Sequence, residues 1–209
     1  MLFMGWFNVG PSCLTVPREL TYDGTLNSLR SNPVAELAKL REASLGSHQS
    51  PVTLVADGPP MSIFDAGKAS VTSDMEMSVS VPAAGVSFGV AIMAADKDTA
   101  EIVLRVVVGP VAVSGLRTVN MSVTSASKPL AAGSFAVPGD EKTVAVRVLA
   151  DRMLAEIFVA SGRGVVAVPV AAPGKNTKNA GAFVFADKTS VTVESADAWD
   201  MGCGWARYP

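Results

Sequence analysis

The chain has 209 residues, of which 49% are hydrophobic and 17% are charged. This balance excludes a disordered chain and supplies enough apolar material for a core. Val accounts for 30 residues and Leu for only 14, and such an excess of β-branched residues favours strands over a helical bundle. The net charge is −2, without any block of like charges, so we expect no nucleic-acid partner.

The first fifty residues predict one hairpin and one short helix. An Asp-Gly turn between two β-prone pieces predicts a hairpin near residues 18–29. An Asn-Pro pair then offers an N-cap and a first helical position for a short helix over residues 32–41, with an acid near its start and bases near its end. Residues 42–51 are rich in Ser and Gly, which predicts a connector.

From residue 52 onward, short β-prone segments follow one another at a spacing of roughly 8 to 14 residues. Apolar and polar side chains alternate from Met75 to Val81, which is the period of a half-buried strand. Further predicted strands lie at residues 86–93, 101–108, 117–124, 143–150, 154–160, 164–171, 181–186 and 190–195. Because no helical spacers separate them, we expect an all-β fold, a two-sheet antiparallel β-sandwich of the jelly-roll or concanavalin-like kind.

Two apolar stretches resemble targeting or membrane segments at first sight. The N-terminal stretch lacks a basic flank and is interrupted by Asn8, Gly10 and Pro11, so we expect a strand there and no signal peptide. The charge-free run from Met77 to Ala95 fits two strands joined by a Pro-Ala-Ala-Gly turn. We therefore expect no transmembrane helix and no membrane partner, and the sequence leaves the localisation unknown.

Residues that commonly carry chemistry are scarce. A closed zinc site would need Cys13, His48 and Cys203 together with a carboxylate, so we expect no metal site. His48 lies in a Ser- and Gly-rich string that favours an exposed loop, and the two Cys are expected to be separate thiols. The chain has no glycine-rich phosphate loop, and we expect no cofactor.

Asp151 and Glu156 are the two acids that merit attention. Glycoside hydrolysis needs two carboxyl groups held roughly 5 to 10 Å apart around the scissile bond, and these two flank the junction between two predicted strands. The alternative is that they are polar anchors at a strand bend, paired with Arg147, Arg152 or Arg163. The spacing leaves both possibilities open.

The segment R-V-L-A-D-R-M-L-A-E-I-F-V, from Arg147 to Val159, resembles the signature of the C-terminal β-sandwich of glycoside hydrolase family 32. This family comprises invertases, inulinases and other β-fructofuranosidases. Other parts of the chain resemble family elements in the right order: Met4-Gly5-Trp6, residues 14–20, residues 32–41, Gly162-Arg163, Ala182 to Phe185, and Ala198 to Met201. Met153 and Ala155 depart from the family's usual residues.

The resemblance implies a division into three parts. Residues 1–17 would be a remnant strand resembling the end of a propeller blade, residues 18–50 a linker with the hairpin and helix, and residues 51–209 the sandwich. The family's catalytic motifs lie in its five-bladed propeller, and none of them occurs in this sequence. We therefore assign no catalytic residue and expect no hydrolysis by this chain alone.

Three functions stay open at this point. The first is a non-catalytic accessory sandwich of a β-fructosidase, with a catalytic propeller domain as its partner. The second is a carbohydrate-binding module for fructose-containing sugars, with Trp6, Trp205 and Tyr208 as stacking candidates. The third is a homo-oligomerisation module, in which an apolar patch on residues 1–20 contacts a second copy.

Overall fold

A computed structural model describes most of the chain. The described residues are 1–7, 13–65, 72–82, 84–94, 98–125, 128–151, 154–170 and 181–202, and for Trp6, Phe7 and Cys13 only the backbone is described.

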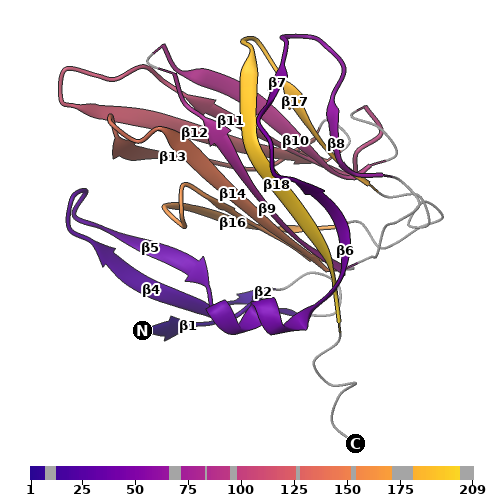
Figure 1. Cartoon of the computed structure of the whole chain (residues 1–209). Helices are drawn as coiled ribbons and strands as arrows, with labels where there is room; N and C mark the ends of the chain where they lie inside the picture. Colours follow the sequence, from indigo (N-terminus) through magenta and orange to yellow (C-terminus); the bar gives the residue numbers. More distant parts are fainter. Residues whose placement is uncertain are drawn as a thin grey trace, which may run out of the picture.

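Two antiparallel sheets packed face to face form the body of the molecule (Figure 1). The six-stranded sheet has the order β13 (Lys128–Pro138), β12 (Leu116–Ser125), β11 (Ile102–Val108), β10 (Val86–Ala94), β17 (Gly181–Ala186) and β8 (Met61–Phe64). The seven-stranded sheet has the order β16 (Gly164–Pro169), β15 (Leu154–Val159), β14 (Thr143–Asp151), β9 (Thr72–Ser80), β18 (Val191–Met201) and β6 (Arg41–His48), with β7 (Val52–Leu54) also paired to β18. The predicted all-β sandwich is confirmed.

The core lies between the two sheets and is built by alternate residues of each strand. In β14, for example, Val144, Val146 and Val148 are buried while Ala145 is exposed. The largest fully buried side chains are Phe88, Ile63, Met75, Ile92, Ile102 and Leu104. Burial of each such side chain stabilises the fold by roughly 1.5–3 kcal/mol, so the sheet-to-sheet contact is the main source of stability.

β9 and β10 belong to different sheets, so the chain crosses the sandwich between Ser80 and Val86. Arg117 is buried at this end of the molecule, 5% exposed. Its guanidinium donates to the carbonyl oxygens of Pro82 at 2.8 Å and Gly139 at 3.2 Å. Arg117 therefore joins two connections and satisfies carbonyls that no strand can pair.

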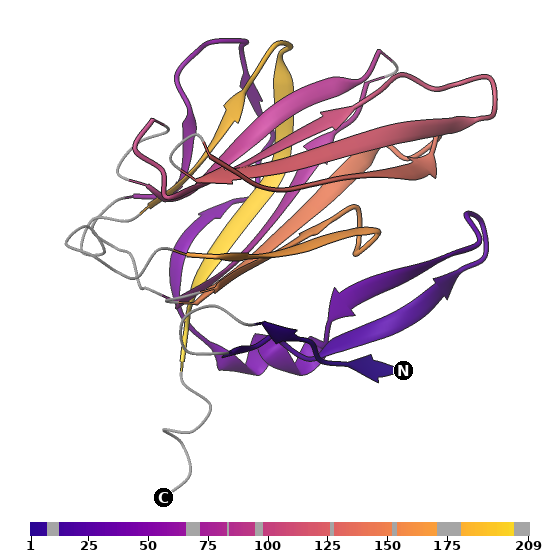
Figure 2. The same ribbon diagram turned by 180° about the vertical axis from the view of Figure 1, so that it is seen from behind.

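The N-terminal residues pack on the outside of the seven-stranded sheet. β1 (Leu2–Phe3), β4 (Arg18–Asp23) and β5 (Ser28–Pro33) form a three-stranded sheet, and β2 (Trp6–Phe7) pairs with β3 (Cys13–Leu14). Both views place the β4–β5 hairpin beside β16 (Figures 1 and 2). The hairpin confirms the one predicted near residues 18–29.

The last strand of the sandwich occupies an interior place in its sheet. β18 pairs with β9 along one edge and with β6 and β7 along the other. Figure 1 shows β18 in yellow, running between its neighbouring strands β9 and β6.

The structure corrects three predictions. The short helix is a 3₁₀ helix, η1 (Ala35–Leu40), with Val34 at its N-cap and no side-chain cap, because Asn32 and Pro33 belong to β5. The predicted connector over residues 42–51 is wrong for most of its length, because Arg41–His48 is a strand paired to β18. His48 therefore lies half-buried at a strand end and not in a loop. The strand β13 was not predicted at all.

Candidate functional site

The outer face of the seven-stranded sheet is the part of the molecule where charged residues and the N-terminal segment meet. On β15, Ala155, Ile157 and Val159 belong to the core, so the alternate residues Glu156 and Phe158 point outward. Both are nevertheless buried, at 2% exposure each. The N-terminal segment covers them, as the contacts of Val16 and Arg18 show.

Glu156 is fully engaged by two groups of this segment. One oxygen, Oε2, accepts a short hydrogen bond and ion pair from Arg18, and the other, Oε1, accepts the backbone N–H of Val16 at 2.6 Å. The guanidinium carbon of Arg18 also lies 5.2 Å from the centre of the Phe158 ring. A cation over an aromatic face adds to the attraction. This contact fixes residues 16–18 to β15.

The two acids singled out from the sequence do not form a catalytic pair. Glu156 faces Leu149 across the β14–β15 ladder and Asp151 faces Leu154, so the two carboxylates are diagonal neighbours on one face. Asp151 is exposed, whereas Glu156 is enclosed by its partners. The anchor interpretation is right for Glu156, whose partner among the described residues is Arg18. Arg147 and Arg163 pair with other carboxylates, and Arg152 lies outside the described residues.

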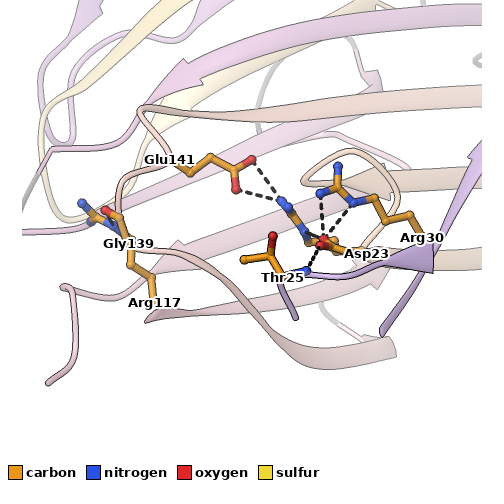
Figure 3. A network of polar contacts seen from close by, with 7 residues as sticks. Asp23, Thr25, Arg30, Arg117, Gly139 and Glu141 are labelled. Carbon is orange, nitrogen blue, oxygen red and sulfur yellow. Dashed lines mark hydrogen bonds and ion pairs between the residues drawn. The ribbon is translucent and has the colours of Figure 1, made fainter. Parts of the chain in front are cut away.

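A second polar network holds the tip of the β4–β5 hairpin (Figure 3). The carboxylate of Asp23 accepts from Arg30 Nε and Arg163 Nε, each at 2.9 Å, and from the backbone N–H of Thr25 at 3.1 Å. Arg163 also donates to Glu141 at 2.8 Å. The network connects the hairpin to the turn between β15 and β16 and to the connection that precedes β14.

The electrostatics of Asp23 follow from these contacts. Burial by itself raises the pKa of this carboxyl group, but the hydrogen bonds and positive charges of Arg163 and Arg30 outweigh burial and lower the pKa from 3.8 to about 2. Asp23 is therefore charged at all ordinary pH values and attracts both arginines.

A third cluster lies further along the same outer face. Asp74 is fully buried and accepts from Arg41 Nε at 2.7 Å and from Arg147 Nε at 2.9 Å, and both arginines also pair with Glu76. The guanidinium of Arg41 stacks 3.7 Å from the centre of the Trp199 ring. Burial lowers the pKa of Arg41, but Asp74 and Glu76 outweigh burial and raise this pKa above its usual range. Arg41 thereby fastens the start of β6 to β9 and β18.

Exposed apolar side chains gather at the start of the chain. We define the N-terminal apolar surface as Met1, Leu2, Phe3, Met4 and Leu14, which are 80, 73, 44, 50 and 53% exposed. Residues 1–3 are held by β4, through the Met1 carbonyl that accepts from the Leu20 N–H at 2.7 Å. The Thr15 N–H donates to the Gly5 carbonyl at 2.9 Å, and Leu14 faces the backbone of Trp6 across the β2–β3 pair. These five exposed side chains lie within residues 1–20, where the sequence predicts an apolar patch.

The stacking candidates for a sugar lie beyond what the structure describes. Trp205 and Tyr208 fall outside the described residues, and of Trp6 only the backbone in β2 is described. An open hollow of about 370 Å³ on the outer face is lined by Ser80, Val81, Pro82, Lys142, Ser190 and Thr192. None of these residues is aromatic, so carbohydrate binding stays a prediction.

The described residues were compared with the requirements of a metal site and of a membrane-spanning helix. Among the described residues, no three His, Cys, Asp or Glu side chains cluster in a way that could hold a metal ion. Cys13 lies on β3, and Cys203 falls outside the described residues. Within the described part of the chain, no helix has the length and apolar character to cross a membrane.

Sequence reasoning missed Arg18, Asp23, Arg41 and Asp74. Each lies in a strand; Arg18, Asp23 and Asp74 are buried and Arg41 is partly buried, so these charges interrupt the alternation of apolar and polar residues. Asp74 shows this most clearly, because it lies between Ser73 and Met75, which are also buried. A carboxylate in a run of buried residues signals an arginine partner, but not which arginine.

The fold is shared with several enzymes of known structure. Fructan 1-exohydrolase IIa from Cichorium intybus, in a complex with 1-kestose, matches 91% of this chain with a TM-score of 0.70 and 21% identity. Exo-inulinase from Aspergillus awamori matches 98% with a TM-score of 0.66 and 16% identity. Sucrose-6-phosphate hydrolase from Lactobacillus gasseri matches 95% with a TM-score of 0.58 and 16% identity.

In each case the match covers only part of the other protein. This chain spans 41% of the fructan exohydrolase, 41% of the exo-inulinase and 38% of the sucrose-6-phosphate hydrolase. A search of curated protein sequences finds no significant match. The family profile described as "Glycosyl hydrolases family 32 C terminal" matches residues 36–200. The chain therefore belongs to glycoside hydrolase family 32, and it corresponds to the C-terminal domain of that family.

Proposed function

We propose that this chain is the non-catalytic accessory sandwich of a β-fructosidase, and that it supports a separate catalytic part by packing against it. The observation that carries this proposal is the N-terminal apolar surface. Five large apolar side chains exposed in one short segment are unusual for a surface that faces only solvent, and they are typical of a surface that contacts another protein.

The way in which this surface is held adds support. Val16, which follows Leu14 and Thr15, and Arg18, two residues further on, are fixed to Glu156 of β15. A docking surface that is rigid before contact loses little conformational entropy on association. The N-terminal apolar surface is thus built as a fixed extension of the sandwich.

The extent of the family match points in the same direction. The solved relatives contain more than half of their length outside the region that this chain covers. A catalytic part in that remaining length would be the natural partner of the N-terminal apolar surface.

A first experiment is an activity measurement on the purified chain. We expect no release of fructose or reducing sugar from sucrose, inulin or levan. Robust turnover by this chain alone would contradict the non-catalytic role.

A second experiment tests the support role directly. The part of the Cichorium fructan 1-exohydrolase outside the match is joined to this chain, and the thermal stability of the chimera is measured. Leu2→Ser together with Phe3→Ser should lower that stability, because it removes apolar contact area. Leu29→Ser is the control, since Leu29 is 61% exposed in the hairpin but lies outside the N-terminal apolar surface. Equal effects of both changes would contradict the proposal.

A further inference from the structure

The strand β12 carries a sequence motif that the proposed function does not use. Asn120-Met121-Ser122 has the form Asn-x-Ser with a residue other than proline in the middle, and it is the only Asn-x-Ser or Asn-x-Thr triplet in the chain. Such a triplet is an acceptor for an N-linked glycan where the Asn lies at the surface of the folded protein.

The structure places Asn120 on a free surface. Val119, Met121 and Val123 of β12 belong to the core between the sheets, so Asn120 and Ser122 project from the outer face of the six-stranded sheet. Asn120 is exposed. The N-terminal hairpin lies outside the other sheet, beside β16, and therefore does not cover this position (Figures 1 and 2).

The surroundings of Asn120 leave room for a bulky group. Its neighbours on the same face of β12 are Thr118 and Ser122, and it faces Val107 of β11 and Ser134 of β13 across the two ladders. All four side chains are short, and Thr118, Val107 and Ser134 are themselves exposed. A glycan on the Asn120 amide would therefore extend into solvent above small neighbours.

The fold itself gives no reason for an Asn at this position. Asn is depleted in strands, because its side chain competes for backbone hydrogen bonds. The Asn120 amide makes no hydrogen bond with another described residue that would compensate for this. The other outward residues of β12, Thr118, Ser122 and Thr124, are hydroxyl residues. Asn120 is thus the residue of this face that a modification explains and the packing does not.

We propose that Asn120 carries an N-linked glycan that lies over the outer face of the six-stranded sheet. The donor is an oligosaccharide joined through a diphosphate to a lipid. The Asn120 Nδ2 forms a bond to C1 of the first N-acetylglucosamine, and the bond from C1 to the diphosphate oxygen breaks. The lipid diphosphate leaves with that electron pair, and the amide nitrogen loses one proton to a base of the transferase. The proposal includes entry of the chain into the secretory pathway and is independent of the proposed function.

The position of β12 sets the time of the reaction. β12 is an interior strand, paired with β11 along one edge and with β13 along the other. After folding, both ladders hold the backbone of the triplet, so the transfer must come before the sheet is complete. Once attached, the glycan covers Val107, an apolar side chain that is 43% exposed next to Asn120.

The test of the acceptor is synthesis of the whole chain, behind a cleavable signal peptide, in a cell extract that contains endoplasmic reticulum vesicles. We expect one glycan, seen as a single downward step on a gel after treatment with peptide-N-glycosidase. Asn120→Gln and Ser122→Ala should each lose this step, and Ser122→Thr should keep it. Thr118→Gln and Thr124→Ala are the matched controls, since both lie on the same face of β12 outside the triplet, and both should keep the glycan.

This readout does not depend on the folding of any variant, because the transfer precedes folding. A parent chain without a glycan would overturn the proposal, and so would a glycan that persists in Asn120→Gln. The secreted, glycosylated parent then tests the place of the glycan on the fold. We expect it to unfold in urea in one cooperative transition and to stay free of aggregates at a higher concentration than Asn120→Gln. A glycosylated chain that fails to fold would contradict a glycan on this sheet.

Discussion

Arg18 and Glu156 lie 138 positions apart in the chain and form an ion pair whose side chains are only 10% and 3% exposed. Arg18 lies outside the region that matches the family profile, and Glu156 lies inside it. The pair therefore makes the N-terminal segment a structural part of the sandwich.

Glu156→Ala should destabilise the protein by about 3–5 kcal/mol, because it leaves a buried guanidinium without its counter-charge. The free energy of unfolding in urea measures the effect. Glu19→Ala is the control, since Glu19 is the exposed neighbour of Arg18, and it should change the stability by less than about 0.5 kcal/mol. If both variants unfold at the same urea concentration, the pair does not anchor the segment.

Asp23 makes the free energy of unfolding depend on pH. Its pKa is 3.8 in the unfolded reference and about 2 in the folded protein, so the unfolded state binds its proton first as the pH falls. The contribution of Asp23 is complete above pH 3.8 and is lost as the pH falls toward 2. Unfolding measured across this window should show a shallower pH dependence in Asp23→Asn than in the parent. Parallel curves for the two proteins would argue against the assigned role of Asp23.

Gly162→Ala should loosen the hairpin from the sandwich. Gly162 has φ of +78°, and a Cβ at this position would lie 2.5 Å from the Ser31 carbonyl oxygen. Two effects act at Gly162, the strain of a positive φ and the clash of the added Cβ. Gly115→Ala isolates the first effect, because Gly115 has φ of +76° with no atom within 4 Å of the added Cβ. We expect a loss of about 1 kcal/mol for Gly115→Ala from backbone strain alone and a larger loss for Gly162→Ala.

The readout for Gly162→Ala is hydrogen exchange together with urea unfolding. The Ser31 N–H donates to the Gly162 carbonyl at 2.9 Å, so its protection should fall in Gly162→Ala and persist in Gly115→Ala. Unchanged protection of Ser31 in both would mean that the contact is not needed for docking.

Asp74 and Glu76 contact the same two arginines but differ in burial, with side chains 0% and 41% exposed. Asp74→Ala should cost about 3–5 kcal/mol, because two partly buried arginines lose their common partner. Glu76→Ala should cost no more than about 1 kcal/mol, since solvent screens its interactions. Urea midpoints of the two variants measure the difference. An equal loss of stability in both would mean that burial does not set the strength of these ion pairs.

The sequence predicted most of the sandwich because its strands follow a strict alternation. Residues Met75 to Val81 alternate, and Met75 to Ser80 form the larger part of β9. The edge strand β13 escaped prediction because its inner face is weakly marked. Only Val137 is fully buried and Phe135 is partly buried, and the Ala, Gly, Ser and Pro residues around them hide the alternation. β6 escaped for a related reason, since its Ser and Gly residues imitate a connector.

The polar networks could not be predicted from spacing. Asp23 meets Arg163 across 140 positions, and Arg41 meets Asp74 across 33. Which arginine reaches which carboxylate depends on the order of strands in the sheet and on the docking of the hairpin. Local patterns in a single sequence carry neither kind of information.

The interior position of β18 has a consequence for synthesis on the ribosome. β9 emerges more than a hundred residues before β18, yet one of its edges is completed only by that last strand. Until β18 has left the exit tunnel, one edge of β9 has no strand to pair with. Contacts between such distant strands form slowly, and during this interval the unpaired edge of β9 is open to association with other polypeptides.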